Sequence, residues 1–131
     1  NLPIPKEVEG ADCSKCLLGE NGEEPVGALM MGTGATAIWE DGHEWRAFRT
    51  RQYTYAVYRV DGQEFLFDNL RDPLQMDNLI NNPAYTDIAG ELRGKMLSKM
   101  KSINDTFESS SYYEKNWVEN RLIMRTATLQ G

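Results

Sequence analysis

The sequence contains little of what metal sites and redox centres need, since it has one histidine, His43, and two cysteines, Cys13 and Cys16. A structural zinc ion takes four Cys or His ligands, so this chain alone cannot build such a site. The sequence also lacks any run of about 20 apolar residues, the length that a membrane-spanning helix needs. Lysine and arginine number 14 against 20 aspartates and glutamates, which gives a net charge of −6. This acidic balance argues against non-specific nucleic-acid binding and against a polybasic membrane-surface segment, so we expect neither partner.

The 131 residues are enough for one domain that buries a hydrophobic core without help from metals or disulfides. The chain begins at Asn1, without an initiator methionine and without an apolar signal-like stretch. That beginning suggests a fragment or a processed product, and it leaves the cellular compartment unknown.

Residues 1–24 are predicted to form a linker or leader, because Pro3 and Pro5 favour extended backbone and polar turn residues follow. The motif Cys13-x-x-Cys16 is compatible with a redox pair. Such a pair needs a strand-to-helix setting, which a proline-rich linker does not supply. We therefore interpret the two cysteines as small, partly buried thiols, and their role stays open.

An α+β fold is predicted for residues 25–107. Dense tyrosines and β-branched residues favour strands, and Asp61-Gly62 between two such segments is a strong hairpin signal. Apolar residues then recur every three or four positions from Pro83 to Phe107, which predicts one long helix. We expect an antiparallel sheet of about four strands packed by this helix. The expected strands are 25–31, 45–50, 53–59 and 64–68, and an irregular C-terminal extension, 108–131, is expected to wrap onto the domain or a neighbour.

The segment 32–44 is predicted to be a long loop between the first two strands. Its opening Gly-Thr-Gly could cradle an anion through backbone N–H groups, but no third glycine or helix follows, so positive φ angles explain the glycines more simply. Trp39 and His43 make the loop a candidate ligand-facing surface, and Arg46 follows as a candidate anion contact. Two alternatives stay open: the tryptophans pack on the sheet, and the arginine lies on a solvated face or pairs with a glutamate across strands.

Three motifs occur in order between Trp45 and Leu79: Trp-Arg-Ala-x-Arg-Thr-x-x-Tyr-x-Tyr, then Glu-x-Leu-Phe-Asp, then Asp-Pro-x-Gln-x-x-Asn-Leu. Together they resemble the C-terminal subdomain of the sulfatases, the arylsulfatase-like sulfuric ester hydrolases. The resemblance extends from about Gly10 to about Phe107. It implies the same sheet-plus-helix fold, with residues 1–24 as the leader from a catalytic domain that this chain does not include.

The resemblance implies that the full-length parent is an enzyme that hydrolyses sulfate esters. Sulfatases use a formylglycine made from the cysteine of Cys-x-Pro-x-Arg, and a calcium ion held by Asp and Asn residues. Neither Cys13 nor Cys16 has a proline two residues on, and no acidic cluster resembles the calcium site. Calcium and formylglycine are therefore implied for the missing catalytic domain. This piece is expected to be inactive alone, with no catalytic residue, cofactor or metal of its own.

The expected partners are the parent's own N-terminal catalytic domain and, through it, a sulfated small molecule or carbohydrate. The sheet is expected to pack against the catalytic domain, and Trp39, His43 and Arg46 are the candidates for substrate contact at the pocket mouth. An apolar patch left by the missing domain favours self-association of the isolated piece. The alternative is a freestanding module that binds a ligand or a protein through its aromatic loop. An independent small enzyme ranks third, since one histidine and no acid/base pair leave little to run it.

Overall fold

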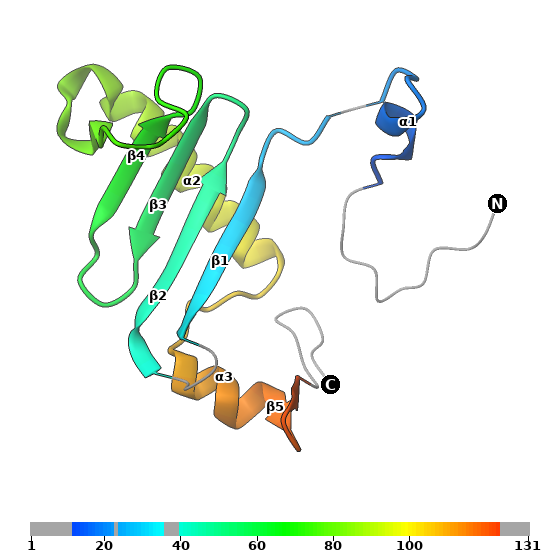
Figure 1. Cartoon of the computed structure of the whole chain (residues 1–131), viewed down its shortest axis with the longest axis vertical. Coiled ribbons are helices and arrows are strands. Elements are labelled where there is room, and N and C mark those ends of the chain that lie inside the picture. Colours follow the sequence, from blue (N-terminus) through cyan, green and yellow to red (C-terminus); the bar gives the residue numbers. More distant parts are fainter. Residues whose placement is uncertain (1–11, 23, 36–39, 124–131) are drawn as a thin grey trace.

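The computed structural model describes residues 12–22, 24–35 and 40–123 of the chain. Four strands form one antiparallel sheet in the order β1-β2-β3-β4, and helix α2 crosses one face of it (Figure 1). This sheet with one helix packed across it confirms the predicted α+β fold. In the described ranges no helix covers the opposite face, so one side of the sheet is open (Figure 1). The main elements are α1 (Ser14–Leu17), β1 (Ala28–Ala35), β2 (Glu40–Arg49), β3 (Tyr53–Tyr58), β4 (Glu64–Asp68), α2 (Thr86–Ser102), α3 (Ser110–Trp117), β5 (Val118–Glu119) and β6 (Leu122–Ile123).

The hairpin between β3 and β4 forms where the sequence predicts it. Gly62 takes a φ of +65°, a left-handed conformation that glycine adopts without steric cost. The side chain of Asp61 accepts a hydrogen bond from the backbone N–H of Gln63 at 2.9 Å, so it satisfies a turn donor. The Asp-Gly pair therefore sets the register that places Tyr55 opposite Leu66.

The loop predicted for residues 32–44 is wrong for most of its length, because β1 continues to Ala35 and β2 begins at Glu40. The two strands stay paired although their register shifts between Thr33 and Ala35. Gly34 takes a φ of +77° at the shift. The strand pair absorbs the irregularity as a bulge instead of ending there.

The predicted long helix is shorter than its apolar pattern suggests. Pro83 begins a single 3-10 turn, Pro83–Tyr85, and the α-helix α2 follows from Thr86 to Ser102. The chain then takes left-handed backbone angles at Asn104 (φ +55°) and Phe107 (φ +57°), which a right-handed helix cannot continue through. The last apolar positions of the pattern therefore lie in the connection after the helix.

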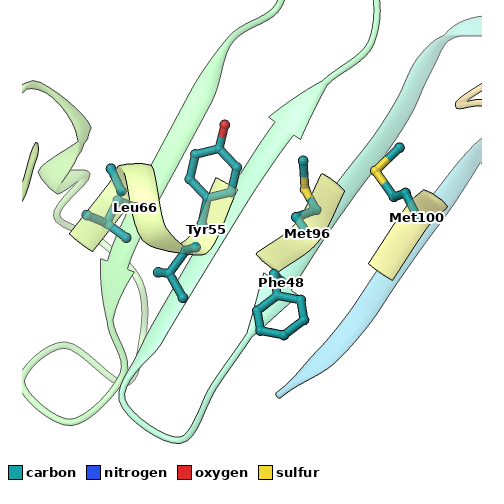
Figure 2. Close-up of a cluster of buried hydrophobic side chains, with 7 residues drawn as sticks. Phe48, Tyr55, Leu66, Met96 and Met100 are labelled. Atoms are coloured by element: carbon teal, nitrogen blue, oxygen red, sulfur yellow. The ribbon is translucent and has the colours of Figure 1, made fainter. Parts of the chain in front are cut away.

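The core lies between α2 and the covered face of the sheet. Phe48, Tyr55 and Leu66 come from three neighbouring strands, and Met96 and Met100 come from the helix (Figure 2). Each is at most 6% exposed. Full burial of one such side chain contributes about 1.5–3 kcal/mol, so this layer contributes substantially to the stability of the fold.

The outer edge of β4 is covered by a side chain rather than by another strand. Asn78 accepts a hydrogen bond from the backbone N–H of Leu66 at 2.9 Å and donates one to the carbonyl of Glu64 at 3.2 Å. Its carbonyl oxygen also accepts from the backbone N–H of Ile80, which starts the 3-10 turn Leu79–Asn81. This side chain satisfies edge groups that could otherwise pair with another chain.

The C-terminal extension is more regular than predicted. Helix α3 begins at Ser110, and the short strands β5 and β6 pair behind it. Helix α3 lies at the end of β1 and β2, and its Tyr113 is only 3% exposed (Figure 1). The described part of the extension therefore packs onto the domain, one of the two outcomes expected for it. Among the described helices, none combines the length and the apolarity that crossing a membrane requires.

Candidate functional site

The open face of the sheet carries a shallow groove of about 310 Å³ with an aromatic floor. Tyr58 and Phe65 meet edge to face with ring centres 5.9 Å apart, and Phe65 and Phe67 stack at 6.1 Å. Trp45 and Met30 extend the apolar lining toward β1. These side chains are only partly buried, so this face presents apolar surface that no described element covers.

The other end of the groove is polar and internally hydrogen-bonded. The amide nitrogen of Gln75 donates to the hydroxyl of Thr54 at 3.1 Å and to the side chain of Asn69 at 2.9 Å. Arg49 also reaches the Thr54 hydroxyl, at 3.3 Å. Gln75 has a φ of +55°, which turns the chain so that its side chain folds back over the sheet. The groove is thus bounded by a preformed polar wall.

Trp45 packs against the sheet, as one of the open alternatives proposes. A Cβ placed on Gly32 would lie 2.2 Å from the indole nitrogen of Trp45, so the glycine leaves room for the ring across the strand pair. The pairing of an aromatic ring with a cross-strand glycine explains why this position of β1 has no side chain. Trp39, the other tryptophan of this region, lies outside the described residues.

His43 lies near the start of β2 and is exposed. Side chains alternate along a strand, so His43 shares its side of the sheet with Trp45 and Ala47, which line the groove. The bulge at Gly34 lies directly beside it, since a Cβ on that glycine would sit 3.5 Å from the Cβ of His43. The histidine therefore stands at one end of the open face.

Arg46 lies on the covered face and is fully buried. Its guanidinium donates to both carboxylate oxygens of Asp105, at 2.5 and 2.9 Å, and to the hydroxyl of Tyr113 at 2.7 Å. It also donates to two backbone carbonyls, those of Gly32 and Trp45. Burial alone would lower the pKa of Arg46, but the hydrogen bonds and charge of Asp105 outweigh it and raise that pKa. All its strong donors are used within the domain.

The ring of Phe107 completes the surroundings of this guanidinium, with the Cζ atom of Arg46 4.6 Å from the ring centre. A cation over an aromatic face in a desolvated site gains about 2 kcal/mol. Arg46 thus ties the segment that follows α2 to the sheet. Its predicted contact with substrate stays a prediction, and the structure gives this side chain an internal role.

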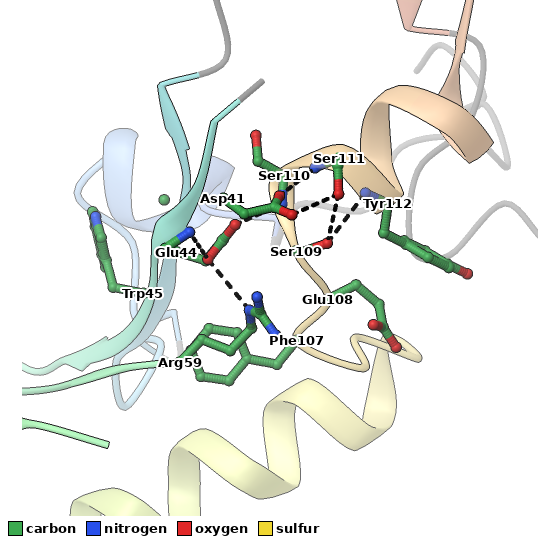
Figure 3. A network of polar contacts seen from close by, with 12 residues as sticks. Asp41, Glu44, Trp45, Arg59, Phe107, Glu108, Ser109, Ser110, Ser111 and Tyr112 are labelled. Atoms are coloured by element: carbon green, nitrogen blue, oxygen red, sulfur yellow. Dashed lines mark hydrogen bonds and ion pairs between the residues drawn. The ribbon is translucent and has the colours of Figure 1, made fainter. Parts of the chain in front are cut away.

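A second polar cluster joins the start of β2 to the N-terminus of α3 (Figure 3). Glu44 accepts from the backbone N–H of Ser110 at 2.6 Å, and Asp41 accepts from the backbone N–H and the hydroxyl of Ser111, both at 2.7 Å. Arg59 donates to the other oxygen of Glu44 at 3.3 Å. Carboxylates are favourable at this end of a helix, where unpaired N–H groups carry partial positive charge.

Both carboxylates titrate below their ordinary range. Burial would raise the pKa of Glu44, but hydrogen bonds from the backbone and from Arg59 outweigh it and lower that pKa. Hydrogen bonds from Ser111 lower the pKa of Asp41. Sequence reasoning missed this cluster, although the run of serines at 109–111 was an available signal for a helix start.

The interpretation of the two cysteines as partly buried thiols is wrong. Cys13 and Cys16 are both exposed and unpaired; Cys13 is the N-cap residue of α1 and Cys16 lies within its single turn. Within the described ranges, no three His, Cys, Asp or Glu side chains gather as a metal site. Nor does either cysteine stand in a Cys-x-Pro-x-Arg context. The described residues therefore do not form a calcium site, and the sequence holds no Cys-x-Pro-x-Arg for a formylglycine, the two features that the family resemblance implies for the parent.

No protein-family model matches the chain. The chain is 35% identical over 117 residues to the ulvan-active sulfatase of Formosa agariphila, and the match covers 89% of this chain and 23% of that protein. The chain thus spans less than a quarter of the length of this curated relative.

Two solved structures contain the same fold. One is a 2-O GAG sulfatase, with a TM-score of 0.67 and 20% identity over 90% of this chain and 24% of that chain. The other was solved in complex with its substrate D-glucosamine-2-N,6-O-disulfate, with a TM-score of 0.68 and 17% identity over 80% of this chain and 22% of that chain. At these identities the two structures show a shared fold alone.

Proposed function

Since this chain corresponds to one segment of a sulfatase, as its motifs predict, we propose that it is the C-terminal subdomain of a longer enzyme that hydrolyses sulfate esters. The observation that carries the proposal is the extent of the sequence match, which covers 89% of this chain but only 23% of the related sulfatase. A match over most of this chain but only a small part of the relative supports the view that the chain is one part of a larger protein. An independent small enzyme ranks third, behind a freestanding binding module, because the sequence has a single histidine and suggests no acid/base pair.

The open face of the sheet is the surface that we propose packs against the catalytic domain. Its aromatic floor, formed by Tyr58, Phe65 and Phe67, is fixed by ring contacts and remains partly exposed. Apolar area that leaves water contributes about 25 cal/mol per Å², so a covering domain gains free energy from this face. The opposite face already has its cover in α2.

The substrate contact that we propose is His43, with Trp39 as the second candidate from the sequence. Ligand pockets form preferentially where two domains meet, and His43 stands at one end of the face assigned to the interface. Arg46 is left out of this proposal, because its guanidinium is occupied by Asp105 and Tyr113. The substrate class that we propose is a sulfated polysaccharide, by analogy with the ulvan-active relative.

The chain alone is proposed to be inactive. It has no Cys-x-Pro-x-Arg sequence to supply a formylglycine. Calcium and formylglycine are assigned to the proposed catalytic domain, and no step of the reaction is routed through residues of this chain.

The test of the substrate contact uses the longer protein with the natural residues and with His43→Ala. Sulfate release is measured on oligosaccharides prepared from ulvan and on a small aryl sulfate. We expect roughly a tenfold loss of kcat/KM on the oligosaccharide, as for loss of one or two polar contacts, and little change on the aryl sulfate. Equal values for the two proteins on both substrates contradict the contact.

The test of the interface uses the isolated chain. Phe65→Ser removes one aromatic ring from the open face, whereas Leu97→Ser removes an exposed apolar side chain from the solvent side of α2 and serves as the control. We expect the unaltered chain to self-associate in sedimentation at high concentration, and Phe65→Ser alone to weaken that association. If the unaltered chain stays monomeric at every concentration, the proposal that the open face is an interaction surface is contradicted.

A freestanding binding module is the second candidate function, because the groove of about 310 Å³ falls within the range of small-ligand sites. Calorimetry of the isolated chain with sulfated oligosaccharides separates the two. Tight binding by the isolated chain favours the module, and its absence favours the subdomain of a longer enzyme.

A further inference from the structure

We propose that Asp41 and Glu44 are positioning residues, which hold His43 in place by binding the N-terminus of α3. The proposal rests on the proposed function of His43 as a substrate contact. It assigns a task to the C-terminal segment, whose helix becomes the support for the start of β2.

The local backbone explains how two nearby carboxylates reach the same helix. Regular strand alternation places residues 41 and 44 on opposite sides of the sheet. Gly42 interrupts the alternation with a φ of +107°, and its N–H donates to Glu44 at 3.0 Å. Asp41 and Glu44 therefore both contact α3 (Figure 3). His43, which lies between them in the sequence, stays exposed.

The contacts with α3 are numerous for so short a stretch. Three hydrogen bonds of 2.6 to 2.7 Å join the two carboxylates to the first turn of the helix, and two of them accept backbone N–H groups that have no partner inside a helix. Glu44 is fully buried and also binds Arg59, which follows β3. The start of β2 is thus held from the helix and from the neighbouring strand.

The helix itself is anchored independently, so it can serve as a fixed support. Tyr113 of α3 accepts a hydrogen bond from the buried Arg46, and the hydroxyl also accepts from the backbone N–H of Glu108. Arg46 in turn binds Asp105, just before the helix. On the other side of His43, the bulge at Gly34 brings β1 close. His43 is therefore presented by backbone that is held on both sides, which is what a substrate contact requires.

The experiment uses the longer protein and compares Asp41→Ala, Asp41→Asn and His43→Ala with the unaltered enzyme. Asparagine retains one acceptor for the backbone N–H of Ser111 and caps helices about as well as aspartate, so it is the rescuing variant. Glu114→Ala removes an exposed carboxylate from α3 and is the matched control. Substrates are ulvan oligosaccharides and a small aryl sulfate, and amide hydrogen exchange of residues 40–44 is followed without substrate.

We expect Asp41→Ala to raise KM on the oligosaccharide by roughly 3- to 10-fold, the loss of one helix cap, with kcat on the aryl sulfate unchanged. In Asp41→Asn, KM should stay close to that of the unaltered enzyme. Amide hydrogen exchange at residues 40–44 should accelerate in Asp41→Ala alone. The KM change must parallel that of His43→Ala.

Four results overturn the proposal. If His43→Ala raises KM but Asp41→Ala does not, the positioning role is wrong and the substrate contact survives. If Asp41→Ala lowers kcat/KM equally on both substrates, the role is merely structural. If exchange at 40–44 is unchanged in Asp41→Ala, the helix does not hold the strand. No effect of His43→Ala on either substrate rejects the substrate contact, and the positioning role with it.

Discussion

Replacing Asp105 by asparagine removes the negative charge that faces the buried guanidinium of Arg46. The two side chains are 2% and 0% exposed, and they share two hydrogen bonds. Asparagine has nearly the same volume, so the change tests charge rather than packing. Loss of one partner of a buried ion pair costs about 3–5 kcal/mol, because the remaining charge is left uncompensated.

We place the expected cost near the lower bound, about 3 kcal/mol, because the hydroxyl of Tyr113 and two backbone carbonyls still accept from Arg46. A domain of this size is stable by about 5–15 kcal/mol, so the loss is a large fraction of the total. With a urea dependence of about 1.5 kcal/mol per M, the unfolding midpoint falls by about 2 M.

The assay is equilibrium unfolding of the 131-residue chain in urea, followed by circular dichroism. Glu91→Gln is the control, because it breaks the exposed pair with Lys95 on α2, which is worth only about 0.3–0.5 kcal/mol. The double variant Arg46→Met with Asp105→Asn is expected to lose less stability than the sum of its two single changes.

A cost for Asp105→Asn that is no larger than that of Glu91→Gln refutes the reasoning. It would mean that the ion pair does not join the C-terminal segment to the sheet. If the losses of stability of the two single variants simply add in the double variant, the two side chains are not energetically coupled, which also refutes the reasoning.

Three further outcomes follow from individual residues. Because the pKa of Asp41 is lowered in the folded chain, its ionised form contributes to stability fully above the ordinary carboxyl pKa of 3.8, and this contribution is lost as pH falls through the folded pKa. The fluorescence of Trp117, at the end of α3, should therefore change below about pH 4, and it should change less in Asp41→Asn. Burial, and then the hydrogen bond to the carboxylate of Glu64, raise the pKa of Tyr55 to about 12. The protonated hydroxyl therefore stabilises the fold below pH 10, and this stabilisation is lost as pH rises through 12. Tyr55→Phe should remove the phenolate that forms at the highest pH in an absorbance titration. Gly34→Ala should destabilise the chain by about 1 kcal/mol or more, because its φ is +77°, whereas Gly94→Ala within α2, where an added Cβ meets nothing, should stabilise it by up to about 1 kcal/mol in thermal unfolding.

Local patterns predicted the parts of the fold that depend on nearby residues. The Asp61-Gly62 turn follows from the two side chains involved, and the alternation of Tyr53–Tyr58 follows from a strand with one face in the core. The spacing of apolar residues likewise identified α2, since three residues of that pattern, Leu92, Met96 and Met100, are buried on the helix.

Patterns failed where distant residues decide the structure. The glycines of 32–34 suggest a loop, but pairing of β1 with β2 keeps them in a strand, where one glycine makes room for Trp45 and the next forms a bulge. Arg46 looked like a surface arginine because its partner Asp105 lies 59 residues away. A pairing of that sequence separation leaves no local trace.

In the candidate site, too, one feature could be predicted from the local sequence and another depends on distant residues. His43 is exposed at one end of the open face, where a ligand contact is feasible. Its two supporting carboxylates became visible only with α3 in place, since neither Asp41 nor Glu44 belongs to a motif that predicts a helix contact.

If this chain is one subdomain of a larger sulfate-ester hydrolase, as we propose, it cannot release sulfate without the rest of that protein. The most direct measurement compares sulfate release from ulvan oligosaccharides by the isolated chain and by the longer protein that contains it. We expect release by the longer protein and none by the isolated chain. Sulfate release by the isolated chain, or a longer protein that releases none from ulvan or from an aryl sulfate, would contradict this proposal.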